Sequence, residues 1–138
     1  MNKSILIGGG IILFVALATV WLSNTSSDRS SEEDDTAATP VVAPELSQTA
    51  QSGEIAFNEN CAACHGKNAA GTDQGPPLIH KFYGAKRHAD FAFVIAAKSG
   101  VPSHHWRFGS MPPVEGVTDE EIQSIIRFIR EIQAANGI

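Results

Sequence analysis

Apolar residues recur at intervals of three and four near the end of the chain, which is the spacing of one face of an α-helix. The members of this stripe are Ile122, Ile125, Ile126, Ile129 and Ile132. Thr118 and Glu121 have the spacing of a capping box, in which each side chain binds the backbone N–H of the other residue. Asn136 and Gly137 are typical of a helix end. The pattern predicts a long C-terminal helix that buries its isoleucine face.

Two earlier segments also have helical patterning. One starts at Gly53 and includes Phe57, and the other takes Asp90 as its N-cap and ends before Gly100. The apolar face expected for the second helix consists of Phe91, Val94 and Ile95. No segment shows the alternation of a β-strand. The fold class predicted for residues 53–138 is therefore all-α.

The N-terminal stretch from Ile5 to Leu22 has eighteen residues without a charge, after a lone Lys3. As a helix it would reach roughly 27 Å, close to the thickness of a bilayer's hydrocarbon core. We expect residues 1–22 to be a transmembrane anchor or signal-anchor, with Trp21 at its outer end. The alternative is a signal peptide that is cleaved after Ala16-Leu17-Ala18. Both interpretations export the rest of the chain.

Charge divides the remaining sequence. Residues 23–52 carry six acids and one base and are rich in Ser, Thr, Ala and Pro, so they are expected to be a disordered acidic linker whose last residues, from about Ser47, could be helical. Residues 53–138 carry nine acids and eight bases. This near balance gives no indication of nucleic-acid binding. An 86-residue domain is near the lower limit of what a side-chain core stabilises alone.

The sequence Cys61-Ala62-Ala63-Cys64-His65 is the C-x-x-C-H signature of covalent haem attachment. On a helical turn these cysteines and the histidine share one face, so the sulfurs and the imidazole converge on one flat ligand. Three other interpretations remain: a thioredoxin-like thiol pair, which needs a βαβ setting; a zinc site, which usually has four ligands; and a strained disulfide. The sequence contains only these two cysteines.

With these motifs in place, residues 53–138 resemble a small mono-haem bacterial class I cytochrome c. Gly53 and Phe57 stand eight and four residues before Cys61, where that family has a glycine and an aromatic residue, and Ile125 and Phe128 match its C-terminal helix. The resemblance implies the cytochrome c fold, with N- and C-terminal helices crossing around one covalently bound haem c, here behind an N-terminal transmembrane anchor.

The resemblance also implies the haem contacts. Gly75-Pro76-Pro77-Leu78 fits the family's G-P-x-L sequence, in which the proline carbonyl binds the imidazole of the iron ligand, so Pro76 and Leu78 are expected at the haem. Met111 is the expected second iron ligand opposite His65, and the sole other methionine is Met1.

Other side chains near Met111 in the sequence are also candidates for haem contacts. Trp106 and Arg107 are candidate donors to a haem propionate, by resemblance. The adjacent His104 and His105 are the main rivals of Met111, and His80 and His88 are weaker ones.

The function that the resemblance implies is single-electron transfer, with iron cycling between Fe(II) and Fe(III), and not enzymatic catalysis. Expected partners are a quinol–cytochrome c oxidoreductase or a terminal oxidase of a respiratory chain. The expected location is the periplasmic side of the bacterial inner membrane, or the soluble periplasm after cleavage. The alternatives are a haem-based sensor with a labile Met111, an electron-entry subunit of a larger complex, and a thiol–disulfide oxidoreductase.

Overall fold

The computed structural model describes residues 40–138. In order, the elements are α2 (Gln48–Asn60), α3 (Ala62–His65), the 3-10 helix η1 (Lys67–Ala69), α4 (Asp90–Ser99) and α5 (Asp119–Ala135). Residues 40–138 contain no strand, and one isolated antiparallel bridge joins Val101 to Met111. The prediction of an all-α domain is confirmed.

The predicted anchor at residues 1–22 lies outside the described residues, as does the predicted linker up to residue 39. Within residues 40–138, no helix combines the length and the apolar character that a membrane span requires.

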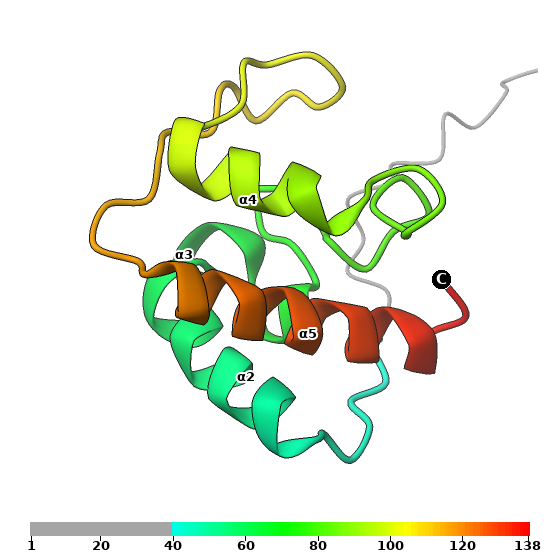
Figure 1. Ribbon diagram of the computed structural model, residues 1–138. Coiled ribbons are helices and arrows are strands. Elements are labelled where there is room, and N and C mark those ends of the chain that lie inside the picture. The colour runs from blue at the N-terminus through cyan, green and yellow to red at the C-terminus, as the bar shows by residue number, and fades with distance from the viewer. Residues whose placement is uncertain (1–39) are drawn as a thin grey trace, which may run out of the picture. The chain divides into compact units, whose positions relative to one another are not determined.

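Helices α2 and α5 cross at very short distance, and this crossing organises the core (Figure 1). At Gly53, a Cβ atom would lie 1.9 Å from the backbone oxygen of Ser124, so a larger residue does not fit. Next to this contact the rings of Phe57 and Phe128 pack with their centroids 5.3 Å apart, and both side chains are fully buried. The glycine and the aromatic pair predicted at the helix crossing are confirmed.

Helix α5 has the boundaries and the buried face that its sequence predicts. All five isoleucines of the stripe are buried, with exposed fractions of 7% or less. Thr118 and Glu121 form the capping box in both directions. The hydrogen bonds from Thr118 hold the pKa of the Glu121 carboxyl below its usual value. Asn136 is the C-cap, and Gly137 follows with a positive φ of 75°.

Helix α2 begins before the predicted boundary at residue 53. Ser47 is its N-cap, with its hydroxyl accepting the N–H of Ala50, and the side chain of Ala50 is completely buried. Val41 and Leu46 pack against the same core. The helical start expected at about Ser47 is thus confirmed. Residues 40–52, predicted as the end of the linker, pack on the folded part through this cap and these apolar contacts.

Helix α4 differs from the prediction at its start and on its apolar face. Its N-cap is Ala89, which makes no side-chain capping bond, and Asp90 is its first residue. The carboxylate of Asp90 pairs instead with Arg130 on α5, at 2.8 Å from Nε. Phe93 packs against the core, while Phe91 is 69% exposed. The predicted capping role of Asp90 is wrong because a cation on another helix binds its carboxylate.

Two connecting segments complete the described part of the chain. Residues 66–89 lead from α3 to α4, and residues 100–118 lead from α4 to α5. In Figure 1, α4 runs alongside α5, and the yellow-to-orange loop joins the end of α4 to the start of α5. Both segments contribute walls of the cavity described next.

Candidate functional site

The C-x-x-C-H motif lies where α2 meets α3. Cys61 is the C-cap of α2 and the N-cap of α3, and its carbonyl accepts the backbone N–H of His65 at 2.9 Å. Cys61 is half-buried and Cys64 is exposed, and neither forms a disulfide. Residues three and four apart in a helical turn lie on one side. The motif therefore presents both thiols and the imidazole along one edge.

One hydrogen bond orients the ring of His65. Its Nδ1 lies 2.9 Å from the carbonyl oxygen of Pro76, and since a carbonyl only accepts, Nδ1–H donates. Nε2 then carries the free electron pair. Burial lowers the pKa of the imidazole, although the bond to Pro76 acts in the opposite direction. His65 is thus held neutral with Nε2 unprotonated, which is the form that binds a metal.

The segment containing Pro76 is seated tightly against the motif. A Cβ atom at Gly75 would lie 2.8 Å from the carbonyl oxygen of Cys64, so only glycine fits there. Leu78 is buried, and its N–H donates to the carbonyl of Ala69 at 2.9 Å. The structure therefore brings Pro76 and Leu78 to the motif, as the sequence predicts.

A cavity of about 490 Å³ opens beside the motif. This volume lies within the roughly 300–1,000 Å³ of typical cofactor and ligand sites. Its walls are largely apolar, and they include Cys61, His65 and Met111. Four isoleucines of α5 contribute to them: Ile122, Ile125, Ile126 and Ile129. His65 and Met111, which are 46 positions apart in the sequence, thus line one cavity that suits a large flat apolar ligand.

Met111 reaches the cavity at the end of a closed loop, residues 101–111, which we call the Met111 loop. Val101 and Met111 exchange two backbone hydrogen bonds of 2.9 Å each, so the two ends of the loop are joined. Gly100 precedes the loop with a φ of 72°, and a Cβ atom there would lie 2.5 Å from the carbonyl oxygen of Met111. The backbone of Met111 is therefore fixed at the end of α4.

Trp106 and Arg107 have different surroundings. Trp106 lines the cavity, and its Nε1–H donates to the hydroxyl of Tyr83 at 2.9 Å. Arg107 is exposed and is not among the residues lining the cavity. The structure thus brings Trp106 to the site but does not bring Arg107 there. The propionate roles of both remain predictions, and in this structure the single N–H of the Trp106 indole is bound to Tyr83.

Three of the four other histidines line the cavity, namely His88, His104 and His105. The rings of His104 and His105 have centroids 4.1 Å apart, and His105 stacks on Phe82 at 5.5 Å. Both remain exposed to solvent, unlike Met111, which is half-buried.

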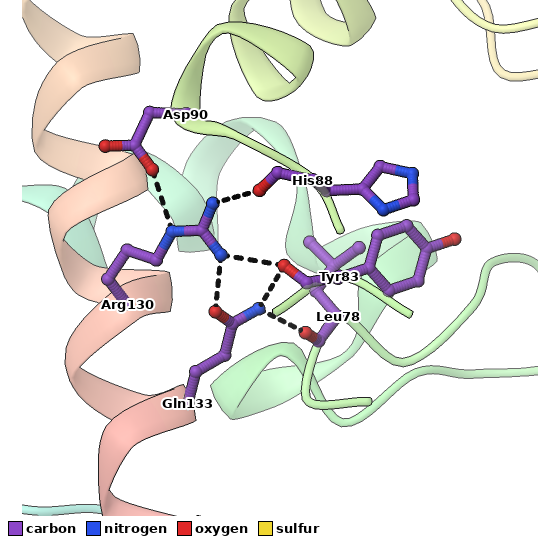
Figure 2. A network of polar contacts seen from close by, with 6 residues as sticks. All are labelled: Leu78, Tyr83, His88, Asp90, Arg130 and Gln133. Atoms are coloured by element: carbon purple, nitrogen blue, oxygen red, sulfur yellow. Dashed lines mark hydrogen bonds and ion pairs between the residues drawn. The ribbon is translucent and has the colours of Figure 1, made fainter. Parts of the chain in front are cut away.

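Sequence reasoning missed a polar network that fixes one wall of the cavity (Figure 2). Gln133 is 1% exposed, and its Nε2 donates to the carbonyls of Leu78 at 2.9 Å and Tyr83 at 3.1 Å. Arg130 donates to the carbonyls of Tyr83 and His88. A signal was present in the sequence, since Gln133 stands one turn after Ile129 on the apolar face of α5.

These features fit a covalently attached haem better than the other interpretations. Burial, with a smaller contribution from Cys64, raises the pKa of the Cys61 thiol to about 11, whereas a reactive thiol pair needs a thiolate of low pKa. Among residues 40–138, no group of three or more Cys, His, Asp or Glu side chains could hold a metal ion such as zinc. The cavity wall carries the Cys61 thiol and the neutral imidazole of His65, and the exposed Cys64 thiol lies one helical turn after Cys61. Two thiols and an imidazole are the donor set that haem c requires.

Comparison with known families gives the same result. The family model described as Cytochrome c matches residues 50–133, which includes the C-x-x-C-H motif, Pro76 and Met111. Neither a search of curated proteins nor a search of solved structures found a match. Proteins of this family attach haem c through cysteine and transfer electrons, and Cys61 and Cys64 are the two cysteines of the sequence. This chain belongs to the cytochrome c family.

Proposed function

We propose that the domain is a mono-haem electron carrier in which His65 and Met111 would hold the haem iron. The observation that carries the proposal is that both side chains line the same apolar cavity although they are 46 positions apart in the sequence. His65 offers Nε2 because its Nδ1–H is bound to Pro76. Met111 offers a thioether on a half-buried, closed loop.

Bound haem c supplies an iron that cycles between Fe(II) and Fe(III). The residues around the iron would set its reduction potential. Histidine and methionine ligands favour the reduced form and raise the potential. The isoleucines of α5 act in the same direction, because an apolar wall disfavours the extra positive charge of the oxidised form. His65 and Met111 would both hold the iron, and the chemistry that this set of residues supports is electron transfer.

We further propose that the protein works outside the cytoplasm, on the periplasmic side of a bacterial inner membrane, with residues 1–22 as its anchor. The charge-free stretch from Ile5 to Leu22 supports this location. A quinol–cytochrome c oxidoreductase or a terminal oxidase would be its partner. The exposed Lys81, Lys86 and Arg87 support docking to an acidic surface.

Replacing Met111 by alanine tests the ligation in the haem-loaded protein. We expect the haem to remain attached, the reduction potential to fall, the absorption band of ferric thioether ligation to disappear, and carbon monoxide to bind the reduced form. Pro112→Ala is the matched control, because Pro112 is exposed beside Met111 and offers no ligand atom. An unchanged potential and spectrum in Met111→Ala would exclude Met111 as the ligand.

The same experiment separates the competing functions. Rapid carbon monoxide binding by the unaltered protein would favour a sensor with a labile Met111. Loss of the native spectrum in His104→Gln or His105→Gln would assign the sixth ligand to nitrogen. Isolation of the native protein in one stable complex would favour an electron-entry subunit over a mobile carrier.

A further inference from the structure

The Met111 loop is held tightly at its ends and loosely along its length. Its ends are joined by the two hydrogen bonds between Val101 and Met111, and Val114 N–H donates to the carbonyl of Ala97 at 2.8 Å. Between these points most residues are exposed, including His104, His105 and Ser110. The bond from Ser103 N–H to the Ser110 hydroxyl, 3.1 Å long, stays within the loop. A contact outside the loop is therefore needed to fix its middle.

The segment opposite this loop, residues 78–89, is fixed by α5. Arg130 Nη1 donates to the Tyr83 carbonyl at 2.7 Å and to the side-chain oxygen of Gln133 at 2.7 Å. Gln133 donates to the Tyr83 carbonyl as well. Figure 2 shows the guanidinium and the amide converging on this carbonyl from one side of α5. The backbone at Tyr83 is thus held by two side chains of α5, Arg130 and Gln133.

The side chain of Tyr83 extends from this fixed point to the loop. Trp106 Nε1–H donates to its hydroxyl at 2.9 Å, and the indole nitrogen has no other hydrogen to give. The Trp106 ring also packs edge-on against His80 and Phe82 of the 78–89 segment, at 5.4 and 6.2 Å between centroids. Tyr83 and Trp106 both line the cavity. The hydrogen bond therefore connects the middle of the Met111 loop to the segment that α5 immobilises.

We propose that the Tyr83–Trp106 hydrogen bond holds the Met111 loop closed, which makes Tyr83 a positioning residue for the methionine ligand. A thioether binds iron weakly, so the fraction of time that it stays bound depends on how firmly its loop is held. Tyr83 holds the loop without contributing a ligand atom. Its hydroxyl binds Trp106, while its backbone carbonyl is bound by Arg130 and Gln133. The inference rests on the proposed ligation by Met111.

Tyr83→Phe and Trp106→Phe in the haem-loaded full chain test this role, because each removes one polar hydrogen-bonding group and keeps an aromatic ring. We expect carbon monoxide to bind the reduced variants roughly 2- to 10-fold faster than the parent, which is the range that losing one hydrogen bond corresponds to. Exchange of the Val101 and Met111 amide hydrogens should accelerate by a similar factor. The double variant should be no faster than either single variant, since all three lack the same bond.

The matched control is Ser52→Ala, which removes a hydrogen bond to the carbonyl of Gln48 within α2 and should leave both rates unchanged. Three outcomes would overturn the inference. One is a variant that unfolds more easily but keeps the parent's rates, because Tyr83 would then be merely structural. Another is a double variant whose effect is the product of the single ones. The third is a parent without the thioether absorption band, which would overturn the Met111 ligation itself.

Discussion

At the scale of single residues, hydrogen bonds to backbone carbonyls and side-chain hydroxyls decide the chemistry of the site. The 2.9 Å bond from His65 to Pro76 selects the tautomer that leaves Nε2 free. That bond could be predicted, because the G-P-x-L sequence places an acceptor at a known spacing after the histidine. The partner of Trp106 could not be predicted. Tyr83 lies 23 residues away in a segment without periodicity, so no sequence pattern relates the two side chains.

Tyr83 gives a prediction at this scale for alkaline pH. Burial raises the pKa of its hydroxyl above the usual value of 10.0, and the bond from Trp106 partly offsets that rise. Above about pH 10 the unfolded chain loses a proton that the folded chain retains, so the free energy of unfolding should fall as the pH rises. In Tyr83→Phe, the free energy of unfolding measured by urea titration should fall less steeply between pH 9 and about 11 than in the parent.

Trp106→Phe provides the second half of this test. Removing the indole N–H should raise the pKa of Tyr83 further, because that bond is the contribution that lowers it. The sequence contains a single tyrosine, so a tyrosine-specific isotope label reports its titration without overlap. A pKa that falls or stays constant in Trp106→Phe would contradict the hydrogen bond.

At the scale of elements, α5 has three roles. Its isoleucines pack on α2 and line the cavity, its capping box fixes its start, and Arg130 and Gln133 hold the 78–89 segment. The first two could be predicted, since periodicity and capping are local in sequence. The third could not, because its acceptors are backbone carbonyls and the sequence does not identify which carbonyls a side chain will meet. The same limit explains the wrong N-cap at Asp90.

The two arginines of α5, Arg130 and Arg127, allow a prediction with an internal control about the 78–89 segment. Arg130 is 16% exposed in its side chain and donates to four acceptors, whereas Arg127 is 60% exposed and pairs with Glu131 alone. Arg130→Lys keeps the charge but loses the planar fork, so it should lower the free energy of unfolding by about 1–3 kcal/mol. Arg127→Lys should change it by less than about 0.5 kcal/mol. Equal effects in chemical denaturation would contradict the assigned roles.

The start of α2 gives another prediction. Glu131 accepts both the N–H of Ser47, at 2.9 Å, and its hydroxyl, at 2.7 Å, and these bonds lower the pKa of the carboxyl. Ser47→Ala should lower the free energy of unfolding by about 1 kcal/mol through the lost cap. The stabilisation from Glu131 is present above about pH 4.5 and is lost as the pH falls through its lowered pKa.

In Ser47→Ala the carboxylate keeps the backbone donor but loses the hydroxyl. The decline in stability on acidification should therefore be shallower than in the parent. Thr49→Ala, also near the start of α2, is the control and should keep the parent's acid profile. A steeper acid decline in Ser47→Ala would show that the hydroxyl does not lower the pKa of Glu131.

At the scale of the whole described domain, the main feature is a core that the side chains do not fill. Phe57, Phe128, Ile129 and Ile132 are buried in the core, yet Phe57, Ile129 and three further isoleucines of α5 also line the cavity. An unfilled cavity costs roughly 24 cal/mol per Å³, so about 490 Å³ corresponds to at most on the order of 10 kcal/mol. That is comparable to the entire stability of a small domain. The ligand is therefore expected to be part of the fold.

Replacing Cys61 and Cys64 together by alanine should accordingly leave the domain largely unfolded. Circular dichroism should show most of the helical signal lost, and the visible spectrum should show no covalently attached haem. Ala62→Ser and Ala63→Ser, which alter the residues between the cysteines, should keep both signals. A compact, colourless double variant with native helix content would contradict the claim that the cofactor completes the core.

In the network of Figure 2, Arg130 and Gln133 bind only backbone atoms of the 78–89 segment. The acceptors there are the carbonyls of Leu78, Tyr83 and His88, and a carbonyl is the same for every type of amino acid. Side chains of this segment that neither line the cavity nor contact the Met111 loop can thus be exchanged while Arg130 and Gln133 hold the backbone in place. A library randomised at exposed positions such as Lys81, Ala85 and Lys86 should retain a high proportion of folded, haem-containing members, so redesign for new redox partners could start from this segment.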